Sequence, residues 1–187
     1  MVLSEPKKIY LRKIWWIAAF LYVVFIYSTL GIAPALWNKL NYFLGGKVIL
    51  AQYIIYSIIG LLILIYIAFI KKEKSPIKYF LFFLFIGLFF VMIKLAKYPA
   101  EKIHIAEYGL LGVFLYNALK MHFNRLSGKL YTYGFILCLI IGALDEVIQW
   151  ILPNRYFGWY DIFMNGASGM ITLLIIRFNI IKTGKIM

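Results

Sequence analysis

Ionisable and amide side chains gather in one stretch of an otherwise apolar chain, between Gly142 and Asn165. Carboxylates in such a stretch can act as general bases, and a guanidinium matches the geometry of a phosphate or carboxylate partner. The side chains of these types are Asp145, Glu146, Gln149, Arg155, Asp161 and Asn165. Apolar runs flank the stretch on both sides, so we expect the acids to face a partner or a wet pocket.

A second group of polar side chains lies earlier in the chain and follows the periodicity of a helix. Glu101, His104 and Tyr108 share one helix face, and Glu107 lies one turn after His104. An imidazole flanked by carboxylates is suited to proton transfer. We therefore predict that His104, Glu107 and Glu146 are catalytic residues that act as general bases.

The residues that we predict to bind substrate come from both polar groups. They are Lys102, Tyr108, Gln149, Arg155, Asp161 and Asn165. Glu146, together with Glu107 or His104, could instead hold a divalent cation. The sequence contains no established metal-ligand spacing, so we assign no metal ligand, and it identifies no cofactor. In a structural alternative, the same acids pair with Lys102, His104 or Arg155 only to fix the helix register.

The composition is typical of a membrane protein. The 187 residues are 64% hydrophobic and 14% charged, with a mean hydropathy of +0.88. Apolar runs of about 20 residues recur, which is the length that crosses a bilayer. Because these runs are too long for barrel strands, we predict an all-α, polytopic helical membrane protein that forms one compact membrane domain. The single cysteine, Cys138, lies within an apolar run, and one cysteine excludes an internal disulfide.

We predict about six transmembrane helices. They cover residues 14–33, 48–70, 77–95, 101–123, 130–152 and 160–178. Residues 34–47, between the first two spans, are predicted to form a loop. The first apolar run is longer than the roughly 7–15 residues of a secretory signal, so we expect it to be retained as a helix.

Lys and Arg are distributed unevenly between the two sides of the predicted bundle. Most of the 20 such residues lie near the two termini and in the connections after the second and fourth spans. Because positively charged loops stay inside, we predict that both termini are cytoplasmic. The net charge of +13 then reflects topology and anionic lipid headgroups, and we expect no nucleic-acid partner. The polar groups of the last three spans form one layer roughly 5–9 Å below the outer surface.

The two polar groups resemble the two signatures of VanZ-like membrane proteins. The segment from Glu101 to Gly112 resembles the acidic-Lys-x-His-x-x-Glu-Tyr-x-x-Leu-Gly segment of one branch of that family. The residues that resemble the second signature are Glu146, Gln149, Pro153, Arg155, Asp161 and Asn165. The resemblance covers residues 77–178. It divides the chain into an N-terminal two-helix extension, 1–76, and a VanZ-like four-helix region, 77–187.

The resemblance implies a multi-pass protein of the bacterial plasma membrane, linked at the cell envelope to resistance to the glycopeptide teicoplanin. We therefore expect an outward-facing pocket that binds or processes a lipid-linked, phosphate-bearing envelope molecule, with Arg155 on the phosphate. Whether the chain is an enzyme is left open. The expected partners are membrane lipids, such a precursor and subunits of a membrane complex.

Two alternative functions remain. In the first, the chain is a non-catalytic accessory subunit of a larger membrane complex, and the polar cluster fixes helix packing or docks a partner. In the second, the acids form a transport path or proton relay. The relay is less favoured because the acids lie toward one surface, and the first three spans have no acid near their centres.

Overall fold

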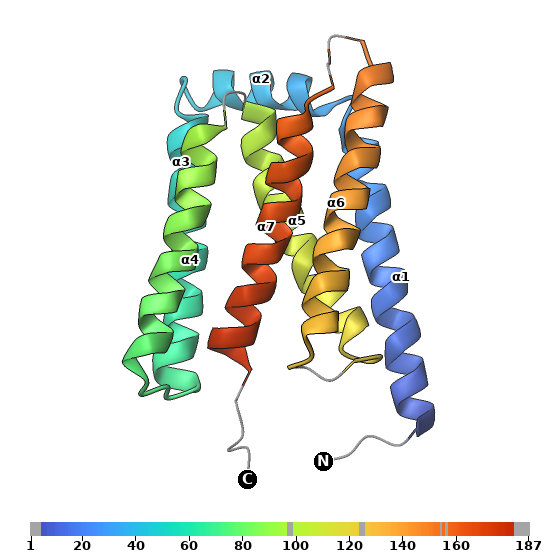
Figure 1. Ribbon diagram of the computed structural model, residues 1–187. Helices are drawn as coiled ribbons and strands as arrows, with labels where there is room; N and C mark the ends of the chain where they lie inside the picture. Colours follow the sequence, from blue (N-terminus) through green and yellow to red (C-terminus); the bar gives the residue numbers. More distant parts are fainter. Residues whose placement is uncertain (1–4, 97–98, 124–125, 154, 156, 182–187) are drawn as a thin grey trace.

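The computed structural model describes residues 5–96, 99–123, 126–153, 155 and 157–181, and the regular structure in these residues is helical throughout. Figure 1 shows long helices that run side by side, with one shorter helix across their ends. The elements are α1 (Glu5–Thr29), α2 (Ala33–Phe43), α3 (Val48–Ile65), the π-helix η1 (Tyr66–Ile70), α4 (Pro76–Leu95), α5 (Pro99–Leu119), α6 (Gly128–Ile151), α7 (Trp159–Ile175) and the π-helix η2 (Ile176–Ile180).

Five of these helices are long and apolar enough to cross a membrane. They cover Ile9–Thr29, Val48–Ile70, Pro76–Leu95, Gly128–Ile151 and Trp159–Ile180. The prediction of an all-α, multi-pass membrane protein is therefore confirmed. The other predicted span, at 101–123, corresponds to α5, which is not among the five. Lys102, His104 and Glu107 in its first turns lower its apolar character, so a sixth crossing remains a prediction.

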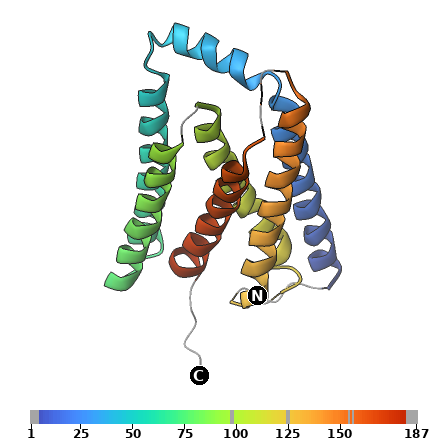
Figure 2. The same ribbon diagram turned by 45° about the horizontal axis from the view of Figure 1, so that its top comes forward.

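The prediction of a loop at residues 34–47 is wrong, because most of this segment forms α2. Pro34 lies in the first turn of α2, where the backbone N–H that proline lacks would have no helical partner. The helix ends before Gly45 and Gly46, whose φ values of 57° and 80° suit glycine. Figure 2 shows α2 crossing the end of the bundle. The sequence prediction relied on long apolar runs, so it did not distinguish a helix that is too short to span a membrane from a loop.

The core of the bundle lies between α5, α6 and α7. In the apolar stretch of the span formed by α7 and η2, 50% of the residues are buried, compared with 6% in that of the span formed by α3 and η1. Small residues allow the close approach of these helices: a Cβ added at Gly112 would lie 2.8 Å from the carbonyl oxygen of Gly169, and one at Gly169 would lie 2.3 Å from Sγ of Cys138. The tight packing fixes how α7 is placed against α5 and α6.

The two ends of the bundle contain different helix ends. At the α2 end lie the starts of α3, α5 and α7 and the ends of α4 and α6, while α1 begins and η2 ends at the opposite end (Figure 1). The polar residues of α5, α6 and α7 singled out in the sequence therefore come from helix segments that share the α2 end.

Candidate functional site

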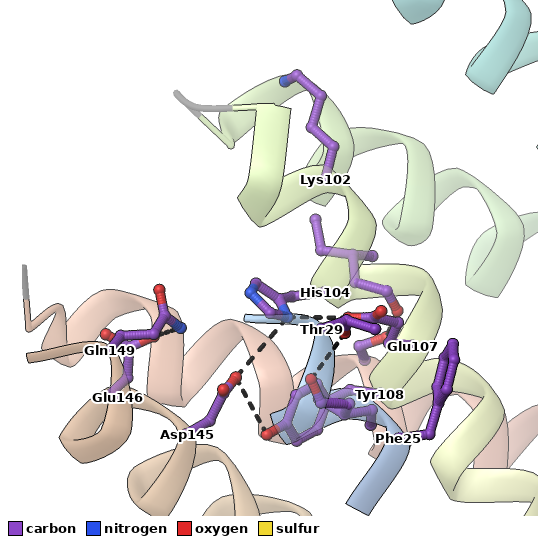
Figure 3. Close-up of polar contacts among 12 residues, drawn as sticks. Phe25, Thr29, Lys102, His104, Glu107, Tyr108, Asp145, Glu146 and Gln149 are labelled. Carbon is purple, nitrogen blue, oxygen red and sulfur yellow. Dashed lines mark hydrogen bonds and ion pairs between the residues drawn. The ribbon is translucent and has the colours of Figure 1, made fainter. Parts of the chain in front are cut away.

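His104 is the centre of a buried polar group that we call the His104 cluster, consisting of His104, Glu107, Tyr108 and Asp145. Nδ1 of His104 lies 3.0 Å from Oε2 of Glu107 on the same helix and 3.7 Å from Oδ2 of Asp145 on α6. The Tyr108 hydroxyl donates a long hydrogen bond of 3.4 Å to the same oxygen of Asp145. Figure 3 shows the Asp145 carboxylate between the imidazole and the Tyr108 hydroxyl. The structure thus brings α5 and α6 together as two walls of one site.

The local sequence explains why α6 and α7 meet at this point. Gly142 lies one turn before Asp145, and a Cβ added to it would lie 3.1 Å from Cβ of Asn165. The absence of a side chain at Gly142 lets α7 carry the Asn165 amide close to α6. Asp145 is fully buried and Asn165 is 2% exposed, so burial of both depends on this contact.

Two buried polar atoms of this region lack a hydrogen-bond partner among the residues that the structure describes. They are Oδ1 of Asp145 and Nδ2 of Asn165. Most buried polar atoms in proteins have such a partner. The His104 cluster therefore has hydrogen-bonding capacity that its own residues do not use.

A small cavity lies beside His104 at the α2 end. Glu101, Asp161 and Asn165 also line it, together with apolar residues, and its volume is about 10 Å³. That is about the space for one water molecule. A hydroxyl or an amine would fit there, whereas a whole lipid headgroup would not.

Glu146 belongs to a separate set of contacts, which we call the Glu146 network. Its Oε1 accepts a hydrogen bond of 3.0 Å from Nε2 of Gln149, and its Oε2 accepts one of 2.8 Å from the backbone N–H of Gly158. The Arg155 guanidinium donates to Oε1 of Gln149. Both oxygens of a nearly fully buried carboxylate are thus used to hold the connection that leads into α7.

Lys102 is directed away from His104, as Figure 3 shows. Its ammonium donates hydrogen bonds of 2.7 Å to the carbonyl oxygen of Ile93 and 2.5 Å to that of Ala96. These are carbonyls at the end of α4, where a cation is favoured by the helix dipole. The structure therefore places this predicted substrate-binding residue in a helix cap rather than in the His104 cluster.

Asp161 lies in the first turn of α7, which is a favourable place for an acid. Its carboxylate folds over Gly158, since a Cβ added to that glycine would meet Oδ2 at 2.4 Å. Asp161 is partly buried and faces the cavity. Of the residues predicted in the sequence, Asp161 and Asn165 therefore join His104 around one space, while Gln149 and Arg155 join Glu146.

The sequence reasoning missed the contribution of α1. The Tyr22 hydroxyl donates to the carbonyl oxygen of Glu107 at 3.2 Å, and the Tyr27 hydroxyl donates to that of Ile141 at 2.8 Å. The two tyrosines in the first apolar run could have indicated that this helix packs against the others, because a hydroxyl within a membrane span needs a hydrogen-bond acceptor.

The chemistry that the site offers is proton transfer and hydrogen bonding. Among the described residues, no group of three or more His, Cys, Asp or Glu side chains is arranged to hold a metal ion. The imidazole instead contacts one carboxylate from its own helix and one from α6. This arrangement suits a base that accepts a proton from a hydroxyl or an amine.

Comparison of the chain with protein-family models, with curated proteins and with solved structures finds no match. The resemblance to VanZ-like proteins accordingly remains a prediction that depends on the two motifs.

Proposed function

We propose that the chain is a VanZ-like protein of the bacterial plasma membrane that binds an envelope molecule at the α2 end and exchanges a proton with it at His104. The supporting observation is the His104 cluster: an imidazole between two carboxylates, beside unpartnered buried atoms of Asp145 and Asn165. A base held by two acids and facing a water-sized cavity is suited to a small protic group. In this proposal His104 is the base, and Glu107 and Asp145 stabilise its protonated form.

The envelope molecule would remain largely outside the cavity. About 10 Å³ beside His104 admits a hydroxyl or an amine, and its acidic surroundings disfavour a phosphate. A phosphate would instead meet Arg155, which is half-buried in the connection between α6 and α7. We propose that Arg155 binds the anionic part and His104 receives the protic group. Glu146, whose two oxygens are hydrogen-bonded, then has a positioning role.

The proposed topology has six crossings, with α5 as the sixth and both termini in the cytoplasm. Its support is the location of the cations, because the end where α1 begins and η2 ends carries Lys71, Lys78, Lys120 and Arg177. Positively charged segments favour the cytoplasmic side. The α2 end, and with it the His104 cluster, would then face outward.

Teicoplanin susceptibility of Gram-positive cells that express the chain tests this function. We expect expression to raise the inhibitory concentration, and His104→Gln or Asp145→Asn to remove the gain. His122→Gln is the matched control, because His122 lies at the opposite end of the bundle and accepts a hydrogen bond from Trp16. Protein in the membrane fraction is measured for each variant. Full protection by membrane-inserted His104→Gln protein would contradict the proposal.

A second candidate is a non-catalytic accessory subunit, and the surface of α3 favours it. Only 6% of the membrane window of α3 and η1 is buried, and large apolar side chains such as Ile54, Ile58 and Leu62 are exposed. This face contacts lipid or another subunit. Purification of the chain after extraction in a mild detergent distinguishes the two functions. A partner protein that co-purifies in stoichiometric amount, and that still co-purifies with the His104→Gln variant, supports the accessory role.

A further inference from the structure

Three large apolar side chains form an exposed row along α2, which we call the α2 stripe. They are Leu36, Leu40 and Phe43, with exposed fractions of 54%, 42% and 84%. Their spacing of four and then three residues places them on one face of the helix. No residue of α2 is buried, so the described part of the chain leaves the stripe uncovered. Contiguous exposed apolar surface of this kind marks a contact with another molecule or with a membrane.

The other faces of α2 differ from the stripe. Ala33, Trp37 and Asn41 recur every four residues and are partly buried, so this face lies against the bundle, where α2 contacts α3 and α5. Asn38 and Tyr42 are exposed, and helical geometry places them on the side opposite to the stripe. The helix is therefore amphipathic, with an apolar face and a polar face on either side of its contact with the bundle.

The position of α2 in the fold brings the stripe to the boundary of a bilayer. The helix crosses the bundle at the level where α4 and α6 end and where α3 and α7 begin (Figures 1 and 2). Trp150 in the last turn of α6 and Trp159 in the first turn of α7 are 70% and 79% exposed at the same end. Tryptophan is enriched at the level of the lipid headgroups. The ends of the spans and the exposed tryptophans thus assign the level of α2 to a membrane interface.

We propose that α2 is an interfacial helix whose stripe is buried in lipid, at the boundary between headgroups and acyl chains, while Asn38 and Tyr42 face water. Its 11 residues are too few to cross a bilayer, and an amphipathic helix lies in the plane of the interface instead. The exposed Ile49 and Leu50 in the first turn of α3 continue the apolar surface into a membrane-crossing helix. This proposal does not depend on the proposed function, because it uses only the spans and the faces of α2.

Nitroxide labels on α2 test the proposal in the full chain, reconstituted in dioleoyl phosphatidylcholine vesicles. Leu40→Cys and Phe43→Cys report on the stripe, and Asn38→Cys and Tyr42→Cys are the matched controls on the polar face. The unsubstituted chain is the labelling control, because its single thiol, at Cys138, is fully buried. Electron paramagnetic resonance then measures the collision of each label with oxygen, which concentrates in lipid, and with nickel ethylenediaminediacetate, which stays in water.

We expect a higher ratio of oxygen to nickel collisions on the stripe than on the polar face, with the stripe labels about 5–10 Å into the interface. Equal nickel access on both faces overturns the proposal, because α2 would then lie in water. Low access of both reagents to the stripe also overturns it, since a second copy of the chain would cover the stripe. Exclusion of nickel from both faces would place the whole helix among acyl chains and is equally contrary. Leu36→Cys replaces either stripe variant that fails to insert.

Discussion

The two ends of the bundle are polar in opposite ways. At the α2 end, acids and amides project from helix faces into tight packing, and about 10 Å³ remains open beside His104. At the opposite end, lysines reach from helix ends around a cavity of about 1010 Å³. At the α2 end the polar side chains are short carboxylates and amides on neighbouring helices, whereas at the opposite end the long side chain of Lys71 lets its ammonium reach the carbonyl oxygen of Asn179 and the carboxylate of Glu73. The two ends therefore differ both in the charge of their side chains and in the open space that these side chains enclose.

The largest expected effect comes from the glycine contacts that let α5 pack closely against α7. Gly112→Ala places a Cβ 2.8 Å from the carbonyl oxygen of Gly169, and backbone cannot yield as a side chain can. We expect a loss of about 1–3 kcal/mol in the free energy of unfolding, measured by thermal or denaturant unfolding in detergent. The control is Gly87→Ala, where an added Cβ meets nothing within 4 Å. Equal stability of both variants would contradict the tight packing of α5 against α7.

The next effect concerns the Glu146 network. Glu146→Leu leaves the Gly158 N–H and the Gln149 amide without their acceptor, which costs about 1–3 kcal/mol for a buried group. Glu146→Gln keeps one acceptor oxygen and should lose less. Hydrogen exchange of the backbone amide of Gly158 measures the difference, because its protection depends on Oε2. Glu146→Gln protein could keep its stability and the slow hydrogen exchange of the Gly158 amide but lose teicoplanin resistance. That result would show that Glu146 is catalytic rather than positioning.

A smaller effect is expected at the junction between α4 and α5. Lys102→Met removes the hydrogen bonds to the carbonyl oxygens of Ile93 and Ala96, and such charged hydrogen bonds contribute about 1.5–3 kcal/mol before the gain from the apolar side chain is subtracted. We expect lower thermal stability with unchanged teicoplanin protection. Lys94→Met, at an exposed position in the last turn of α4, is the control. A loss of protection in stable Lys102→Met protein would return Lys102 to the substrate-binding residues.

The smallest effect is a pH dependence at the opposite end. Glu73 lies in the connection between η1 and α4, and the hydrogen bond from the Lys78 ammonium lowers the pKa of its carboxyl from 4.5 to about 2. Because the folded pKa is below the unfolded one, this contact stabilises the protein above about pH 4.5. Its contribution is lost as the pH falls toward 2. The unfolding temperatures of the protein and of the Glu73→Gln variant, measured between pH 6 and pH 2, should become equal as the pH approaches 2. A constant difference would show that the contact does not depend on the Glu73 charge.

The sequence predicted which polar residues share a helix face, but it did not predict the hydrogen-bond partners of these residues. The spacing of His104 and Glu107 placed both on one face, and the structure brings them within 3.0 Å. It did not predict that Lys102 would cap α4 or that Gly158 would donate to Glu146. Helical spacing fixes directions around one axis, but it contains no information on the rotation of neighbouring helices or the path of a connection.

The sequence by itself determined the class of the protein, the apolar spans and the positions at which polar residues interrupt them. Bilayer thickness and backbone hydrogen bonding leave little choice for apolar runs of this length. The structure showed that α2 is a helix, that Tyr22 and Tyr27 donate hydrogen bonds to backbone carbonyls of α5 and α6, and that a cavity lined by Lys71 and Lys120 lies at the opposite end. These features depend on how close the helices approach, and contacts such as that of Gly112 with Gly169 set the approach only after the chain has folded.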